Sequence, residues 1–333
     1  MSIRAGILGM GWWGRTLVDS VQGEGVDPSD AIRFVAGTTR TPATAAEWAT
    51  ARAIAMEDSL DSLLARDDLD AVVIATPHSQ HEAQIIAAAA AGRHVFCEKP
   101  LALDGAAAQT ATDACRKAGV VLAVGFNRRF LPAFERLVDI VTDGDLGDIL
   151  HVEANFCGPM GFRTGERGWR GEPAESPTGG MTGLGVHCLD AMIALCGPVA
   201  GVRALSLRQA VAGDVDDTTS VQLRFVGGQT GHLATVTATG MLYRVQVFGT
   251  GGWAEMRGVG AAPQALEVVR LEYPPRTERF EPVSLERAEL ECFAEAVRDG
   301  VPFRVPTGDA VHGAAVLSAI GRAAGSDREV RLD

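Results

Sequence analysis

The sequence lacks the long apolar runs that membrane proteins need. No stretch reaches the roughly 18 consecutive apolar residues of a transmembrane helix. The first four residues lead directly into a β-type run and show no signal-peptide pattern. We therefore expect no membrane partner and a cytoplasmic location.

Runs of basic residues are also absent. The chain of 333 residues carries 30 Lys and Arg against 42 Asp and Glu, which gives a formal net charge of −12. Because no basic patch is present, the sequence argues against nucleic acid as a partner. This composition still allows an anionic ligand that one or two local arginines hold.

Paired cysteine motifs are missing as well. The six cysteines are scattered, and none forms a Cys-x-x-Cys motif. This pattern is typical of buried free thiols in a reducing compartment, and we predict no metal site. With 47% hydrophobic and 22% charged residues, the chain has the composition of an ordinary globular protein. Its 333 residues are enough for two domains with separate cores.

A glycine-rich motif follows the first predicted strand, Ile3–Leu8, and precedes an amphipathic stretch, Arg15–Val21. Its glycines fit the G-x-G-x-x-G pattern of dinucleotide-binding folds: Gly9, Gly11 and Gly14. They permit a tight turn, a close approach of pyrophosphate to the backbone, and close packing of helix on strand. Helix N–H groups then face the phosphates. Trp12 and Trp13, inside the motif, either cover the cofactor or pack the helix.

The end of the next predicted strand, Ile32–Gly37, is where such a fold contacts the ribose 2′ position. An NAD site usually has an acid there, but this chain has Thr38, Thr39 and Arg40. A guanidinium can pair with a 2′-phosphate, which a carboxylate would repel. We therefore predict NADP as the cofactor. The alternative is NAD, with Arg40 in solvent.

Strands and helices continue to alternate, which predicts a doubly wound parallel sheet. The strand Asp70–Ala75 ends in a polar segment, and the helix Glu82–Ala91 follows it. The next apolar run ends in Cys97-Glu98-Lys99-Pro100. Because ligands bind outside the carboxyl ends of strands in such sheets, Lys99 is expected where cofactor and substrate meet.

Four motifs in this half occur together in the order of a known family. They are Gly9-x-Gly11-x-x-Gly14, Ala75-Thr76-Pro77-x-x-x-His81, Glu98-Lys99-Pro100 and Gly125-Phe126-Asn127-Arg128-Arg129-Phe130. The sequence resembles the Gfo/Idh/MocA (glucose–fructose oxidoreductase/inositol dehydrogenase) family. The resemblance implies an α/β protein with a Rossmann domain over residues 1–126. It implies an α+β domain over residues 127–333, with a large open, mainly antiparallel sheet that forms homodimers or homotetramers.

The same resemblance assigns roles to single residues. Those implied to line the cofactor, besides the glycine motif and the segment Thr38–Arg40, are Thr76, Pro77, His81, Glu98 and Asn127. Lys99 would reach both nicotinamide and substrate and act in catalysis. The bond between Lys99 and Pro100 is expected to be cis, as it often is before the motif proline in the family.

The second half changes pattern after Phe130. A stretch rich in Gly and Pro, Cys157–Gly180, predicts a long loop that contains Arg163, Arg167, Trp169 and Arg170. These arginines are either solvated or functional. The resemblance places Trp169 and Arg170 at the substrate pocket. A β-rich region, Val199–Val283, and two closing helices complete the chain.

A second catalytic segment precedes the predicted helix that runs through Leu195. The chain has Gly183 where many family members have an Asp, and it keeps His187 and Asp190. The resemblance makes His187 a catalytic, substrate-binding residue. Asp190 either orients the His187 ring from the same helix face and belongs to the substrate site, or makes a packing or interface contact.

These observations predict an NADP(H)-dependent oxidoreductase. It would exchange a hydride with a secondary alcohol or ketone of a small substrate: a sugar, a sugar derivative or a cyclitol. Lys99 would be the general acid/base, with His187 on the same substrate oxygen. Two alternatives are a dihydrodiol or non-sugar ketone dehydrogenase or reductase of the same fold, and a non-catalytic NADP-binding sensor or scaffold.

Overall fold

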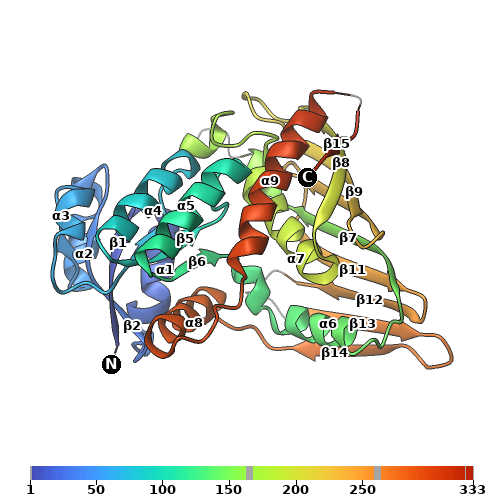
Figure 1. Ribbon diagram of the computed structural model, residues 1–333, viewed down its shortest axis with the longest axis horizontal. Helices are drawn as coiled ribbons and strands as arrows, with labels where there is room; N and C mark the ends of the chain where they lie inside the picture. The colour runs from blue at the N-terminus through green and yellow to red at the C-terminus, as the bar shows by residue number, and fades with distance from the viewer. Residues whose placement is uncertain (1, 163–167, 259–263, 327, 333) are drawn as a thin grey trace. The chain divides into compact units, whose positions relative to one another are not determined.

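The computed structural model describes residues 2–162, 168–258, 264–326 and 328–332. The chain divides into two compact units (Figure 1). The first contains Met1–Ala102, Ala106–Asn127 and Ser284–Val311, and the second contains Leu103–Gly105, Arg128–Val283 and His312–Asp333. Each unit is described by itself.

The described part of the first unit is built on a six-stranded parallel sheet in the order β3-β2-β1-β4-β5-β6. Its strands are β1 (Ile3–Leu8), β2 (Ile32–Thr38), β3 (Ala55–Met56), β4 (Ala71–Ile74), β5 (His94–Glu98) and β6 (Leu122–Gly125). Its helices are α1 (Trp12–Gln22), α2 (Ala46–Ala51), α3 (Leu60–Leu64), α4 (His81–Ala90), α5 (Gly105–Ala118) and α8 (Leu285–Asp299). The predicted doubly wound parallel sheet is confirmed.

The helix α8 belongs to the core of this first unit. Its residues Leu290, Phe293 and Ala294 are buried in one apolar cluster with side chains of β1, β2, β4 and β5. The rings of Phe96 and Phe293 lie 5.7 Å apart between centroids. The structure therefore places Ser284–Val311 with the first unit, where our contiguous boundary at residue 126 had assigned it to the second domain. The apolar face of α8 accounts for the difference, because it packs on the parallel sheet.

The described part of the second unit is built on a nine-stranded sheet in the order β14-β13-β12-β11-β7-β10-β9-β8-β15. Its strands are β7 (Ile149–Cys157), β8 (Val199–Leu207), β9 (Thr218–Phe225), β10 (Thr230–Val236), β11 (Leu242–Gly249), β12 (Gly252–Arg257), β13 (Gln264–Arg270), β14 (Arg276–Phe280) and β15 (Val330–Arg331). Neighbours run antiparallel except β7 and β10. The prediction of a large, mainly antiparallel sheet is confirmed.

Helices cover one face of this sheet. The helix α7 (Val186–Cys196) packs on β7, β10 and β11, and α6 (Pro132–Thr142) packs on β12, β13 and β14. Along β7 the burial alternates, with Val152, Ala154 and Phe156 buried and the residues between them partly exposed. The other face of the sheet therefore presents mostly polar side chains. A final helix, α9 (Thr307–Ala324), crosses from the first unit into the second.

No helix in the described parts of the chain has both the length and the apolar character needed to cross a bilayer. All six cysteines are free thiols, four of them buried.

Candidate active site

The motifs of the first unit meet at one edge of its sheet. The strands β1, β4, β5 and β6 are neighbours, and each motif follows or ends one of them. In open parallel sheets of this kind, the strand order reverses at one point, where neighbouring strands lie on opposite sides of the first strand. Ligands bind outside the carboxyl ends of the strands at that point. Here β1 lies between β2 and β4. The glycine motif, Thr76, Glu98 and Lys99 are thus brought to this edge.

The three motif glycines have different surroundings. Gly9 has a φ of +95°, and a Cβ there would lie 2.6 Å from the carbonyl oxygen of Ala75. A Cβ on Gly14 would overlap the carbonyl oxygen of Gly9. A Cβ on Gly11 would meet no atom within 4 Å. Gly9 and Gly14 are therefore required by chain packing, whereas Gly11 leaves open space beside the backbone.

That open space lies at the start of α1. Gly11 directly precedes the first residue of α1. No side chain caps the N–H groups at the start of this helix. Free N–H groups at a helix start attract phosphate through hydrogen bonding and the helix dipole. Trp12 is 75% exposed beside this position, while Trp13 packs against the core of the unit. The residues present fit a dinucleotide pyrophosphate.

The end of β2 provides a cation near the glycine motif. The carbonyl oxygen of Thr38 accepts a hydrogen bond from the Gly9 N–H at 2.9 Å, so the strand end adjoins the glycine motif. Thr39 is half-buried and Arg40 is exposed. In the described ranges the Arg40 guanidinium makes no hydrogen bond or ion pair. This environment fits an added phosphate group.

His81 is fully buried and links two loops. Its Nδ1 lies 2.9 Å from the carbonyl oxygen of Pro100, and its Nε2 lies 3.1 Å from the carbonyl oxygen of Thr76. The ring therefore connects the segment after β4 with the segment after β5. The Thr76 hydroxyl donates to the Gln84 side chain of α4 at 2.5 Å. We expected His81 to line the cofactor, and the structure places it beneath the two segments that carry Thr76 and Lys99.

Lys99 directly follows β5. Its side chain is half-buried, and its N–H donates to Oε2 of the buried Glu98 at 3.2 Å. The Lys99–Pro100 bond is cis, as predicted. Burial and the nearby Glu98 carboxylate raise the pKa of the Cys97 thiol well above its usual value. Cys97 therefore stays protonated and is no candidate nucleophile.

Asn127 has a partly satisfied side chain. Its amide donates to Oε1 of Glu286 at 3.0 Å, next to the start of α8. Its carbonyl oxygen Oδ1 is buried and has no hydrogen-bond partner among the residues that the structure describes. A buried acceptor without a partner is costly, so a donor from a ligand would stabilise this position.

The second unit carries His187 on the first turn of α7. A π-helical turn, Met181–Gly185, leads into that helix, and such turns are frequent at functional sites. His187 is buried, and its ring lies 5.9 Å from the Phe156 ring of β7. A Cβ on Gly183 would meet no atom within 4 Å, so the backbone there has room for a side chain.

Asp190 forms a buried ion pair. Arg129 donates from Nε to Oδ2 at 2.7 Å and from Nη2 to Oδ1 at 2.9 Å, and the two side chains are 9% and 4% exposed. Both carboxylate oxygens thus accept from Arg129. Of our two interpretations of Asp190, these contacts are the ones that a packing role would make, and a role at the substrate stays a prediction. Sequence reasoning missed the partner, although adjacent arginines within the apolar segment Phe126–Phe130 were a signal.

Two further side chains of the second unit surround Phe156. The Tyr243 ring lies 5.1 Å from the Phe156 ring, and the Arg128 guanidinium lies over both, at 5.4 Å from Phe156 and 5.8 Å from Tyr243. Burial raises the pKa of the Tyr243 phenol well above its usual value, so the phenol is neutral. This cluster supports the Phe156 ring that His187 contacts.

The long predicted loop contains short helical turns, Pro159–Phe162 and Gly168–Gly171. In the second turn the Arg170 guanidinium stacks on the Trp169 ring, 4.1 Å from its centroid. Trp169 is half-buried and Arg170 is exposed. Arg163 and Arg167 lie outside the described residues.

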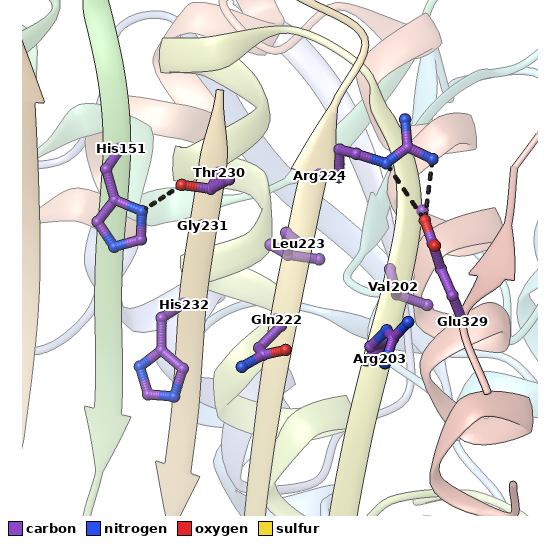
Figure 2. A pocket seen from close by; sticks show the side chains of 11 residues that line it. His151, Val202, Arg203, Gln222, Leu223, Arg224, Thr230, Gly231, His232 and Glu329 are labelled. Atoms are coloured by element: carbon purple, nitrogen blue, oxygen red, sulfur yellow. Dashed lines mark hydrogen bonds and ion pairs between the residues drawn. The ribbon is translucent and has the colours of Figure 1, made fainter. Parts of the chain in front are cut away.

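A hollow of about 540 Å³ lies on the polar face of the second unit's sheet (Figure 2). It is lined by side chains from β7 to β10 and near the chain end, among them His151, Arg203, Arg224, His232 and Glu329. None of the predicted site residues lines it. Within the described ranges no group of three or more His, Cys, Asp or Glu side chains is arranged to hold a metal ion.

The fold and these sites define a class: an oxidoreductase with a dinucleotide-binding unit and a second unit on a large sheet. The model of the oxidoreductase family with an NAD-binding Rossmann fold, GFO/IDH/MocA, matches residues 3–126, and that of the GFO/IDH/MocA C-terminal domain matches residues 134–255. The chain belongs to the GFO/IDH/MocA family, as the motifs predicted.

Individual relatives agree with this assignment. The D-xylose 1-dehydrogenase (NADP(+)) 2 of Haloferax volcanii is 31% identical over 325 residues, 93% of this chain and 97% of that protein. The trans-1,2-dihydrobenzene-1,2-diol dehydrogenase of Mus musculus is 29% identical over 215 residues, and this chain spans 63% of its length. The crystal structure of aldose-aldose oxidoreductase from Caulobacter crescentus, complexed with glycerol, has a TM-score of 0.87 at 26% identity and full coverage of both chains.

Proposed function

We propose that the protein is an NADP(H)-dependent oxidoreductase acting on a secondary alcohol or ketone of a sugar, sugar derivative or cyclitol. The observation that carries the cofactor preference is the exposed Arg40 at the end of β2, in a segment without an acid. The Haloferax relative is named for both a sugar and NADP(+), which supports both parts of the proposal.

The chain's residues have distinct roles in this proposal. The first turn of α1 holds the pyrophosphate, Arg40 holds the 2′-phosphate, and the nicotinamide, when bound, accepts or donates the hydride. Lys99 takes the proton of the substrate hydroxyl during oxidation and returns it during reduction. His187, on the first turn of α7 in the second unit, donates a hydrogen bond to the substrate. Because position 183 has no acid, we assign most of the proton transfer to Lys99.

The Arg40→Ala variant tests the cofactor preference. We expect the Kd for NADP⁺ to rise roughly tenfold or more, because a charge-assisted bidentate contact is lost, while the Kd for NAD⁺ stays within about twofold. Binding is measured by titration calorimetry for both dinucleotides. Arg33→Ala, at an exposed arginine of the same strand, is the matched control. Equal weakening of NADP⁺ and NAD⁺ binding by Arg40→Ala would remove the argument for NADP.

The glycine motif gives a second test, of cofactor placement. In Gly11→Ala the new methyl enters open space, so the melting temperature should stay unchanged while both dinucleotides bind roughly tenfold more weakly. In Gly14→Ala the methyl overlaps Gly9, so stability should fall by about 1–3 kcal/mol. Thermal unfolding with and without cofactor separates the two effects. Unchanged cofactor affinity in Gly11→Ala would contradict the proposed position of the pyrophosphate.

Two alternatives have specific support. The similarity to a dihydrodiol dehydrogenase and the glycine at position 183 favour a non-sugar diol or ketone. A sensor or scaffold would bind NADP without turnover. A substrate screen with NADP⁺ and with NADPH across sugars, cyclitols, dihydrodiols and ketones distinguishes these, since only the sensor leaves every substrate unchanged.

We also propose that the protein forms a homodimer or homotetramer through the polar face of the second unit's sheet. In the middle of that face Arg244 of β11 bonds Glu153 of β7 at 2.5 Å and Glu255 of β12 at 3.3 Å. Leu205 and Leu207 are exposed near its edge. Light scattering after gel filtration gives the subunit count, and a monomer would refute this proposal.

A further inference from the structure

We propose that Arg15 is a positioning residue that sets the preference for NADP over NAD. It ties the glycine motif to the turn that follows Arg40. This inference rests on the proposed NADP preference. Arg15 lies on the first turn of α1, one residue after Gly14.

The Arg15 guanidinium makes two hydrogen bonds to separate segments. Its Nε donates to the carbonyl oxygen of Met10 at 3.1 Å, and its Nη2 donates to the carbonyl oxygen of Thr44 at 2.6 Å. Met10 lies between the first two motif glycines. Thr44 ends the short helical turn Pro42–Thr44, which begins two residues after Arg40. One side chain therefore joins the pyrophosphate segment to the segment that carries the 2′-phosphate cation.

An aromatic ring fixes the orientation of this guanidinium. The Arg15 guanidinium carbon lies 5.4 Å from the centroid of Trp48 on α2, within the range of a cation–π contact. Arg52 contacts the same ring at 4.9 Å and pairs with Asp19 of α1. Arg52 therefore shares the ring with Arg15 but makes neither of the bonds to Met10 and Thr44.

The two segments also touch directly. A Cβ on Gly37 of β2 would overlap the terminal methyl of Met10 and a methyl of Ile7. The Met10 side chain thus packs on the strand that ends just before Arg40. Steric contact sets how close the segments come, and Arg15 holds the turn in a fixed position relative to the motif.

The distance between the glycine motif and the segment that carries Arg40 matters, because NADP has two anionic groups on one adenosine. The pyrophosphate is held at the start of α1 and the 2′-phosphate at Arg40, so both contacts form at full strength only if the two segments keep a fixed distance. NAD has no 2′-phosphate and makes no contact that depends on Arg40. Loss of Arg15 should therefore weaken NADP binding more than NAD binding. Lysine cannot replace it, because an ammonium lacks the planar fork that donates in two directions.

The experiment compares Arg15→Met and Arg15→Lys with Arg52→Met. The Kd values for NADP⁺ and NAD⁺ are measured by calorimetry on the full chain, and melting temperatures show that each variant is folded. For both Arg15 variants we expect the ratio of the NAD⁺ to the NADP⁺ Kd to fall roughly fivefold to tenfold. For Arg52→Met the ratio should stay within about twofold. The double variant Arg15→Met/Arg40→Ala should lose no more selectivity than Arg40→Ala alone, because Arg15 acts through Arg40.

Other outcomes have clear meanings. If Arg40→Ala lowers the ratio but the Arg15 variants leave it unchanged, the role of Arg15 is refuted while the NADP proposal stands. The same conclusion follows if Arg52→Met lowers the ratio as much as Arg15→Met does. If Arg40→Ala itself leaves the ratio unchanged, the NADP proposal fails and the inference fails with it.

Discussion

The Lys99→Met variant is expected to lose between about a hundredfold and ten-thousandfold in kcat, the range typical for removal of a general acid or base. Its Kd for NADP⁺ should change little, because the pyrophosphate and 2′-phosphate contacts lie elsewhere. The chain contains only two lysines, Lys99 and Lys117, among its 30 basic residues. Where a fixed positive charge suffices, the chain uses arginine almost throughout. A lysine at the end of β5 fits proton transfer, because arginine does not release its proton in proteins.

Two companion variants sharpen this test. Lys99→Arg keeps the positive charge and removes the proton-transfer capacity, so we expect it to be nearly as inactive as Lys99→Met. Lys117→Met, at an exposed position on α5, is the matched control and should keep full activity. The measurements are kcat for an assayed substrate and the Kd for NADP⁺. Activity of Lys99→Arg close to that of the unmodified protein would assign Lys99 an electrostatic role instead.

The Arg129→Leu variant is expected to lose about 3–5 kcal/mol of the free energy of unfolding, because it leaves the Asp190 carboxylate buried without the cation that both its oxygens contact. Urea unfolding followed by circular dichroism measures this loss. Arg224→Leu is the control, since its ion pair with Glu329 is partly exposed and such pairs contribute about 1 kcal/mol or less. The double variant Arg129→Leu/Asp190→Leu should regain part of the loss. A decrease for Arg129→Leu no larger than for the control would contradict the buried-pair interpretation.

The sequence predicted the first unit well because its signals are local. Each strand near the site is a short apolar run, and each functional motif directly follows such a run. The positive φ of Gly9 and the cis bond before Pro100 occur at the places that the motifs indicated. Local motifs of this kind report backbone requirements that do not depend on distant parts of the chain.

Contacts between distant residues were not predictable in the same way. The spacing of apolar residues along α8 predicts that one face of the helix is buried. The same spacing does not indicate which of the two sheets that face covers. Asp190 and Arg129 are 61 residues apart, and Arg15 and Thr44 are 29 apart. A single sequence gives the side-chain types but not which distant partners meet, because that depends on the packing of whole elements. The short strand β3 is similarly defined by pairing with β2 rather than by its own two residues.

The position of α8 has a consequence for how the protein is made. The strands and glycine motif of the first unit are synthesised first, but the helix that covers part of their core follows the whole segment Arg128–Val283. During translation the surface that receives Leu290 and Phe293 stays uncovered while that long segment emerges. Exposed apolar surface on a growing chain invites aggregation and chaperone binding. The nascent dinucleotide-binding unit therefore depends on protection at the ribosome, and its folding ends only after strands β7 to β14 of the second sheet have been translated.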